Sequence, residues 1–263
     1  MSQILYYIVY YCMRYRRKVV RKNLVNSFPD KTVAEIVQIE RAFYAFFCDF
    51  IPETIAFYFM TSKSIKKRIT FSGVKEMEAA MGNDKSCVVY LGHYCNWEWV
   101  TSLPLHVHKN IACGQIYHPL ENRFFDKLFL KMRGKFGAES ITMNDTLRRI
   151  IGLKREGKQF MIGFISDQVP HGNALRHKLN FLHQNTSVFT GTERVARQTK
   201  SLVYYLDITR PQRGFYHCQF IPMTDSPQDL PELELTNMYF QLLEKTIHRY
   251  PQYWLWSHNR WKR

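Results

Sequence analysis

The stretch CVVYLGHYCNWEW, residues 87–99, contains the pattern that decides the fold. Its first five residues are apolar or aromatic, a run typical of a strand that is buried on both faces of a sheet. Gly92 follows and permits a sharp turn, and His93 is the first polar residue beyond it. The pattern therefore predicts a strand over 87–91 that delivers a histidine to the carboxyl edge of a sheet, where open α/β folds carry their sites.

Similar runs alternate with helical patterns along the rest of the chain. Further strands are predicted over 110–117, 159–165, 202–210 and 214–223, the last two as a hairpin around Arg213 and Gly214. Helices are predicted over 122–137, 146–157 with Asp145 as its cap, 190–200 and 233–249. Such alternation is typical of an α/β fold with a mainly parallel central sheet flanked by helices.

A helix is also predicted directly after Pro29. Thr32 and Glu35 have the spacing of a capping box, and apolar residues recur with helical spacing as far as Phe50. Pro52 is expected to end or kink this helix, because proline removes a backbone donor and crowds the preceding turn.

Composition limits the class of protein. The 263 residues are 46% hydrophobic and 22% charged, enough apolar material for a sizeable core, which excludes disorder and collagen-like repeats. The net charge of +15 predicts an anionic partner: nucleic acid, an acidic membrane surface or an acidic carrier. Six cysteines without CxxC spacing indicate a reduced, cytosol-facing protein.

The first 30 residues differ from the remainder. The segment 1–29 has no acidic residue and six Lys or Arg, placed after the apolar stretch ILYYIVYYCM at 4–13. Ten residues are too few to span a bilayer, which needs about 20. The stretch is an interfacial anchor, the stub of a longer membrane helix that begins before Met1, or a buried first helix with a solvated basic face. In the first two readings the basic cluster lies at anionic lipid on the cytoplasmic side.

The domain prediction follows from this difference: a membrane-associating segment over 1–30 and a single α/β domain over 31–263. Basic regions rich in Tyr and Trp also suit nucleic acid, but no RNP, KH or zinc-finger pattern is present, so no nucleic-acid partner is predicted. A nucleic-acid-binding module stays the remote alternative. His106 and His108 form an HxH pair without a third ligand, so no metal is predicted.

The candidate chemistry is that of a general base. Glu98 follows His93 by five positions, and a loop that curls back would bring its carboxylate to the imidazole. Such a pair fixes the tautomer of the histidine and stabilises the imidazolium. No Ser or Cys lies in a nucleophile elbow, and a lone cysteine such as Cys95 is more often a packing residue. These features predict direct attack by a hydroxyl of the substrate.

The block GHYCNWEW resembles the Hxxxx(D/E) block of the lysophospholipid acyltransferase superfamily, and more closely that of the lauroyl/myristoyl acyltransferases of lipid A biosynthesis. The resemblance covers nearly the whole chain. Its other matches, in order, are YRRKVVRKNLVNSFPDKT (15–32), IYHPLENRFFDKLFLKMRGKFG (116–137), ISDQVP (165–170), FTGTERVA (189–196) and YPQYWLWSHNRWK (250–262).

The resemblance implies roles for four residues. It places the catalytic histidine on His93, its carboxylate partner on Glu98, the arginine of the second block on Arg133 and the acidic residue of the third on Asp167. Arg133 would hold a phosphate of the acceptor or stabilise the oxyanion, and Asp167 would position that arginine or its own loop. Without a role in the site, Arg133 would lie on an ordinary solvated helix face and Asp167 would belong to an ordinary turn.

The resemblance also implies an activity and a location. The family transfers a fatty acyl chain from acyl carrier protein, its donor substrate, to a hydroxyl of a lipid A precursor at the cytoplasmic face of the inner membrane. No cofactor is expected. Another glycolipid or a lysophospholipid is the alternative acceptor. Family members usually begin with a longer hydrophobic helix, so peripheral binding and an N-terminal anchor both stay open.

Overall fold

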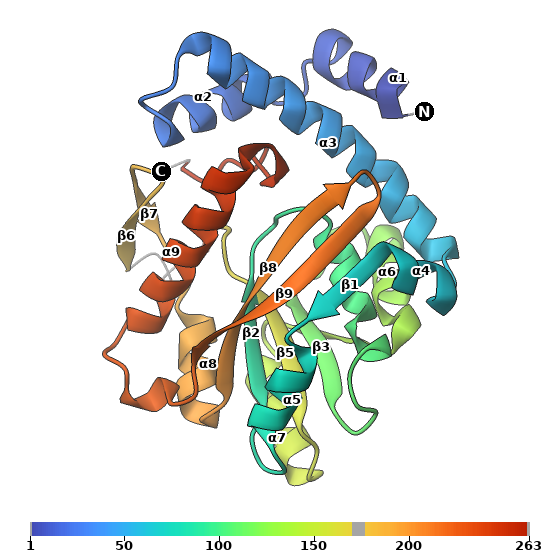
Figure 1. The fold of residues 1–263 in the computed structure, drawn as a ribbon, viewed down its shortest axis with the longest axis vertical. Helices are drawn as coiled ribbons and strands as arrows, with labels where there is room; N and C mark the ends of the chain where they lie inside the picture. The colour runs from blue at the N-terminus through green and yellow to red at the C-terminus, as the bar shows by residue number, and fades with distance from the viewer. Residues whose placement is uncertain (1, 170–176, 262–263) are drawn as a thin grey trace.

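The computed structural model describes residues 2–169 and 177–261, so Met1 and Pro170 lie outside it. Its centre is a seven-stranded sheet with the order β1-β9-β8-β2-β5-β3-β4 (Figure 1). The pairs β2–β5, β2–β8, β3–β5, β3–β4 and β1–β9 are parallel, and only the β8–β9 hairpin within this sheet is antiparallel. The predicted α/β fold with a mainly parallel sheet is confirmed.

The strands of this sheet and the small β6–β7 hairpin occupy the following residues: β1 Ile69–Ser72, β2 Cys87–Leu91, β3 Ala112–Tyr117, β4 Glu139–Thr142, β5 Phe160–Ile165, β6 Lys178–Phe181, β7 Gln184–Ser187, β8 Leu202–Gln212 and β9 Phe215–Thr224. The α-helices are α1 Ser2–Tyr7, α2 Arg17–Ser27, α3 Val33–Phe59, α4 Ser62–Arg68, α5 Val74–Met81, α6 Arg123–Arg133, α7 Thr146–Arg155, α8 Gly191–Thr199 and α9 Glu234–Arg249. The other helical segments, of the 3-10 or π type, are η1 Ile8–Cys12, η2 Trp97–Leu105, η3 Gly134–Phe136, η5 Pro227–Asp229 and η6 Pro251–Tyr253.

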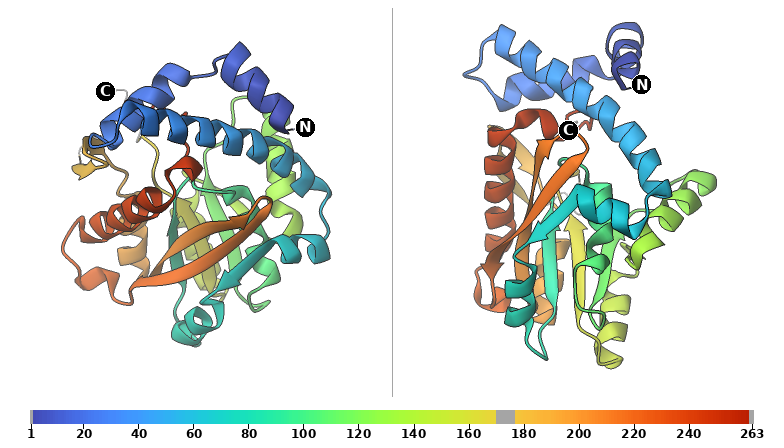
Figure 2. Two further views of the ribbon diagram at one scale, coloured as in Figure 1. Left: turned by 45° about the horizontal axis from the view of Figure 1, so that its top comes forward. Right: turned by 45° about the vertical axis from the view of Figure 1, so that its right-hand side comes forward.

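Helices cover both faces of the sheet. Figure 2 shows α8 and α9 on one face and α6 on the other, with α3 running across the end of the sheet. The strand β2 lies at the centre, and all five of its residues are buried. A strand in this position needs apolar side chains on both faces, which explains the continuous run CVVYL.

The strands and helices predicted with both bounds are present, and their boundaries differ from the prediction by at most four residues. The capping box of Thr32 and Glu35 is formed as predicted. Of the two outcomes expected at Pro52, an end or a kink, the end is wrong, because α3 continues through Pro52 to Phe59. Asp145 occupies the N-cap position of α7 but makes no side-chain capping bond; its carboxylate accepts instead from the hydroxyl of Thr142, 2.7 Å away.

Helix α3 is long and apolar enough to cross a membrane, by length and composition alone. Its acidic residues nevertheless form hydrogen bonds with arginines of other elements. Asp49 accepts from Arg210 of β8 at 2.8 Å, and Glu40 accepts from Arg21 of α2 at 2.5 Å. Both carboxylates are buried, and a buried carboxylate needs such partners. These contacts fasten α3 to the sheet and to the N-terminal helices.

The N-terminal segment packs on α3 with one of its sides. Val9 and Tyr10 are buried, and the hydroxyl of Tyr10 donates to Glu40 at 2.9 Å. Arg17 lies over the ring of Tyr10 and forms an ion pair with the same glutamate. Arg16 donates to the carbonyl of Ser257 near the C-terminus, 3.0 Å away. Part of the basic cluster is therefore bound inside the protein, whereas the buried-helix reading of the sequence predicts a solvated basic face.

Candidate active site

The register of two neighbouring strands brings His93 and Asp167 together. Leu91, the last residue of β2, is paired with Ile165, the last residue of β5. His93 and Asp167 each lie two residues beyond these partners, at the carboxyl edge of the sheet. The imidazole Nδ1 and the carboxylate Oδ1 are 2.6 Å apart, a charge-assisted contact.

Asp167 is held by three donors. Besides the imidazole, the backbone N–H of His93 donates to its Oδ2 at 2.9 Å, and the indole N–H of Trp254 donates to the same oxygen at 2.8 Å. Burial by itself raises the pKa of this carboxyl, but the His93 charge and the three hydrogen bonds outweigh it and lower the pKa to about 2. Asp167 is therefore an anion over the whole physiological pH range.

The hydrogen bonds also indicate the tautomer of His93. Ionised Asp167 accepts only, so Nδ1 of the imidazole carries the hydrogen of the short contact. The other ring nitrogen, Nε2, lies 3.1 Å from the amide Nε2 of Gln168, which has hydrogens to donate. In the neutral imidazole, Nε2 then carries the lone pair and directs it toward Gln168, and this is the form of histidine that accepts a proton from a substrate.

The predicted contact between His93 and Glu98 is not formed in the structure. Glu98 is bound to Arg133 of α6 by two hydrogen bonds, Oε2 to Nε at 2.8 Å and Oε1 to Nη2 at 2.6 Å. The chain turns sharply at Cys95, whose φ is +52°, and η2 begins directly before Glu98. This path directs the carboxylate toward α6, while Asp167 supplies the carboxylate beside the imidazole.

Arg133 is a partly buried cation rather than part of a solvated helix face. Its side chain is 20% exposed, and that of Glu98 is 5% exposed. Burial lowers the pKa of the guanidinium, but the bond and the charge of Glu98 raise it above its usual value. Within the described residues, the third nitrogen Nη1 makes no hydrogen bond, so it keeps donors for an oxyanion or a phosphate.

The C-terminal segment completes the site from the far end of the chain. The N–H of Leu255 donates to the carbonyl of His93 at 3.1 Å, and the N–H of Cys95 donates to the carbonyl of Tyr253 at 2.9 Å. Trp254 lies between these two contacts and directs its indole at Asp167. In the sequence this tryptophan is only one residue of the block 250–262, and it is given no partner there. A buried indole needs a hydrogen-bond acceptor, which is the signal that points to a partner such as Asp167.

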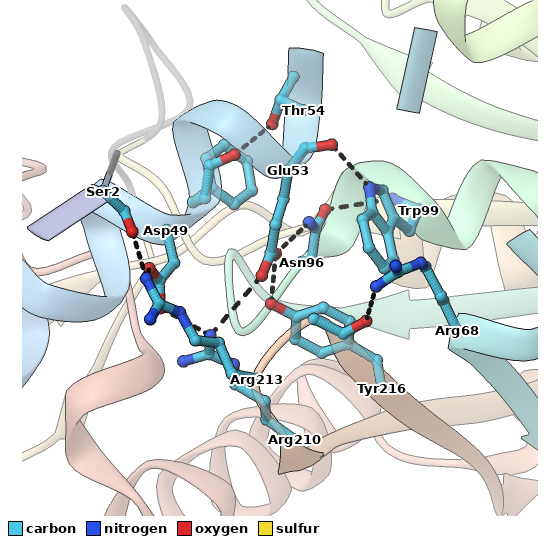
Figure 3. Close-up of polar contacts among 12 residues, drawn as sticks. Ser2, Asp49, Glu53, Thr54, Arg68, Asn96, Trp99, Arg210, Arg213 and Tyr216 are labelled. Carbon is cyan, nitrogen blue, oxygen red and sulfur yellow. Dashed lines mark hydrogen bonds and ion pairs between the residues drawn. The ribbon is translucent and has the colours of Figure 1, made fainter. Parts of the chain in front are cut away.

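Helix α3 holds the turn that follows His93 (Figure 3). The amide of Asn96 donates to Glu53 Oε2 at 2.9 Å, and its oxygen accepts from the N–H of Trp99 at 3.4 Å. Tyr216 of β9 donates to the same Glu53 oxygen at 2.6 Å, and Arg210 forms an ion pair with Glu53 at 3.6 Å. The turn is thus fixed by side chains from α3 and from the hairpin.

Cys95 is placed as a packing residue. Its side chain is fully buried, and its thiol lies 3.8 Å from the carbonyl of Ile208. Burial raises the pKa of the thiol well above its ordinary value. A nucleophilic cysteine requires the opposite, an accessible thiolate with a lowered pKa.

A cavity of about 960 Å³ opens beside the His93–Asp167 pair. His93, Gln168, Glu98 and Arg133 line its polar part. Apolar side chains from the strands and from η2 also line it, among them Val89, Leu103, Cys113, Met161, Leu206 and Phe220. The volume is at the upper end of the range of about 300–1,000 Å³ that is common for ligand sites. An apolar cavity with a base at its edge suits a long hydrocarbon ligand.

His258, a residue of the C-terminal segment, provides a test by pH. It is half-buried, and burial lowers its pKa from 6.5 to about 4. Protonation then favours the unfolded chain, so the contribution of His258 is complete above pH 6.5 and decreases as the pH falls toward 4. In His258→Asn, we expect the free energy of unfolding to fall less between pH 7 and 5 than in the wild type, as measured by urea denaturation. Equal slopes in the wild type and in His258→Asn would contradict the assignment.

The fold and the site together define an α/β protein with a histidine–carboxylate pair at the edge of an apolar cavity. The sequence profile of the bacterial lipid A biosynthesis acyltransferases matches residues 4–263, nearly the whole chain. The chain belongs to this family and is an acyltransferase. A comparison with curated protein sequences finds no match.

Proposed function

We propose that the protein is a membrane-associated O-acyltransferase that moves a fatty acyl chain from an acyl carrier protein thioester to a hydroxyl of a lipid A precursor. The observation that supports this most strongly is the His93–Asp167 pair at the edge of the 960 Å³ apolar cavity, in a chain that matches the family over residues 4–263. The geometry changes one part of the mechanism that the sequence predicts: Asp167 replaces Glu98 as the partner of the base.

His93 acts as the general base. Its Nε2 takes the proton of the acceptor hydroxyl as the oxygen attacks the thioester carbonyl, and Gln168 moves aside or reorients its amide to admit that hydroxyl. The carbon–oxygen bond forms while the carbonyl electrons move to an oxyanion. When the intermediate collapses, the carbon–sulfur bond breaks and the thiolate takes the proton from the imidazolium. A base in this position typically contributes about 10²–10⁴-fold to the rate.

Two ion pairs, His93–Asp167 and Arg133–Glu98, stabilise the charges that develop in the transition state. Asp167, with its lowered pKa, stays ionised and stabilises the imidazolium that forms in the transition state. Glu98 holds Arg133 in one orientation, and Nη1 of Arg133 is the donor we assign to the developing oxyanion or to a phosphate of the acceptor. Glu98 then acts through Arg133 as a positioning residue.

No covalent acyl-enzyme is needed in this mechanism. Cys95 is the thiol closest in sequence to the base, and its burial and raised pKa make it a poor nucleophile. Direct transfer also fits the size of the cavity, because the acyl chain can stay in its apolar part while only the acceptor hydroxyl approaches His93.

The charge of the chain supports the proposed partners and location. Residues 123–158 contain ten Lys or Arg and four acidic residues. Such an excess suits an acidic carrier protein, a phosphorylated lipid A precursor and the anionic cytoplasmic face of the inner membrane. Attachment would be peripheral or through the N-terminal segment.

A second acceptor is favoured by one observation. Among the described residues that line the cavity, Arg133 is the one Lys or Arg, and Glu98 already balances its charge. A phosphorylated acceptor would gain from more cations than this. Transfer to another glycolipid or to a lysophospholipid is therefore the alternative.

Deletion of the gene in the bacterium that carries it tests the acceptor. We expect lipid A that lacks one acyl chain, with phospholipids unchanged, in mass spectra of the two extracted lipid fractions. A plasmid copy of the wild-type gene should restore the missing chain, and a copy with His93→Ala should not. A normal lipid A together with an altered phospholipid or another altered glycolipid would move the assignment to the alternative acceptor.

A further inference from the structure

Helix α6 exposes the apolar side chains that a helix of a soluble protein normally turns inward. Phe124 is 71% exposed, Phe125 50% and Leu128 37%, whereas the one fully buried residue of the helix is Met132. A surface helix is expected to bury its apolar stripe against the core. The outward stripe of α6 therefore lacks a partner within the described part of the chain.

The charges of α6 complement this stripe. Arg123, Lys127 and Lys131 lie on the same helix, and Lys135 follows it. Its one acidic residue, Asp126, is occupied by the N–H of Leu120 at 2.8 Å. Bulky apolar residues flanked by Lys and Arg are the composition of a helix that lies in the interface of an anionic membrane.

The apolar surface continues beyond α6. Lys135 donates to the carbonyl of Tyr58 at 2.5 Å, and Lys131 lies over the ring of Tyr58, so α6 adjoins the last turn of α3. Ile55 and Phe59 in this part of α3 are also exposed, Phe59 at 73%.

The views in Figures 1 and 2 agree that α1, the second half of α3 and α6 lie on one side of the molecule. On α1 and η1, the exposed residues with the spacing of one helical face are Ile4, Tyr7, Ile8 and Tyr11.

The active-site cavity opens next to this surface. The loop 118–121, which leads into α6, lines the cavity, and its Leu120 is itself exposed. A lipid held in a bilayer at α6 could therefore move its chain into the apolar cavity without passing through water.

We propose that the α6 surface, formed by Phe124, Phe125 and Leu128 together with Ile55 and Phe59, seats the protein on an anionic lipid bilayer with the cavity mouth at the level of the headgroups. The proposal rests on the proposed function, in which the acceptor is a membrane lipid. A second copy of the chain is a poorer occupant, because two surfaces with the same excess of Lys and Arg repel each other. An acidic soluble carrier would match the lysines but would leave the phenylalanines without apolar contacts.

A tryptophan probe tests the depth of this surface. In the full-length protein with Phe124→Trp, we expect the emission left after subtraction of the wild-type spectrum, with its five tryptophans, to shift to the blue when phosphatidylethanolamine/phosphatidylglycerol vesicles are added, and brominated lipid to quench it. Val33→Trp is the matched control, because Val33 is 76% exposed at the far end of α3 and should show neither change. Absence of a shift at residue 124 on vesicles that bind the protein would overturn the proposal.

Flotation with the same vesicles measures the contribution of α6 to binding. Phe124→Ser combined with Phe125→Ser should lower the partition coefficient by about tenfold or more, since each phenylalanine loses part of its burial in lipid. Neutral phosphatidylcholine vesicles should bind the wild type more weakly than the anionic vesicles. If the double variant floats like the wild type, or loses a dimer instead of vesicle binding, the surface has another occupant. Vesicle binding requires no acyl transfer, so this outcome is independent of the activity of His93 variants.

Discussion

Replacement of His93 by alanine is expected to lower the rate of acyl transfer by about 10²–10⁴-fold and to leave the fold intact, because the imidazole is the base that takes the proton of the acceptor hydroxyl. The side chain is 17% exposed and lies at the end of β2, outside the buried core, so its loss creates no internal cavity. The measurement is transfer of a labelled acyl chain from acyl carrier protein to the extracted acceptor, with circular dichroism as the test of folding.

His108→Ala is a suitable control for the His93 variant. His108 is exposed and lies in the loop between η2 and β3, and its replacement should leave the rate close to that of the wild type. A folded His93→Ala protein with nearly normal turnover would exclude general-base catalysis by this residue. Mass spectrometry of the protein after incubation with the donor alone should show no acyl adduct; an adduct on Cys95 would instead indicate a covalent mechanism.

The second large effect is expected at Asp167, and it distinguishes the structural pair from the one that the sequence predicts. Asp167→Asn should lower kcat by about 10²–10⁴-fold, because an amide neither stabilises the imidazolium nor holds the histidine in the tautomer that the ionised carboxylate selects. Glu98→Gln should be milder, about tenfold, since the amide can still accept a hydrogen bond from Arg133 and only loosens its position. Both are measured as kcat and KM for acyl transfer.

The order of these two effects decides the assignment. If Glu98→Gln is nearly inactive and Asp167→Asn is close to the wild type, Glu98 is the partner of the base and the contact at Asp167 is structural.

Arg133→Lys adds an independent check of the role given to Glu98. Because lysine cannot form the bidentate contact, Arg133→Lys should behave like Glu98→Gln, and the two changes together should cost little more than either alone.

The local pattern of the sequence determines several parts of this protein. The apolar run CVVYL predicts β2, and the residues after it place His93 at the carboxyl edge of the sheet. The spacing of Thr32 and Glu35 predicts the first turn of α3, and the alternation of runs predicts a mainly parallel α/β fold. These features depend on residues within about one turn or one strand of each other, so a single sequence contains what is needed to predict them.

The partners in the site depend on the tertiary structure. Glu98 is five residues from His93, yet the turn at Cys95 directs it to Arg133 of α6. Asp167 lies 74 residues away, and it reaches His93 because β5 is the neighbour of β2 in the sheet. Strand order and register arise from the packing of the whole sheet, with helices on both faces, and periodicity along one strand does not encode which other strand lies beside it.

In the C-terminal segment, too, the sequence predicts one part and the tertiary structure determines another. The sequence marks Trp254 as an apolar residue near the end of the chain, and only the folded structure places its indole N–H at 2.8 Å from Asp167. Helix α3 is a similar case, since its length and apolar composition suit a membrane span as well as a packed helix. In the structure, the ion pair of Asp49 with Arg210 holds α3 against the sheet. These two groups lie 161 residues apart in the sequence and meet only once the hairpin has folded against α3.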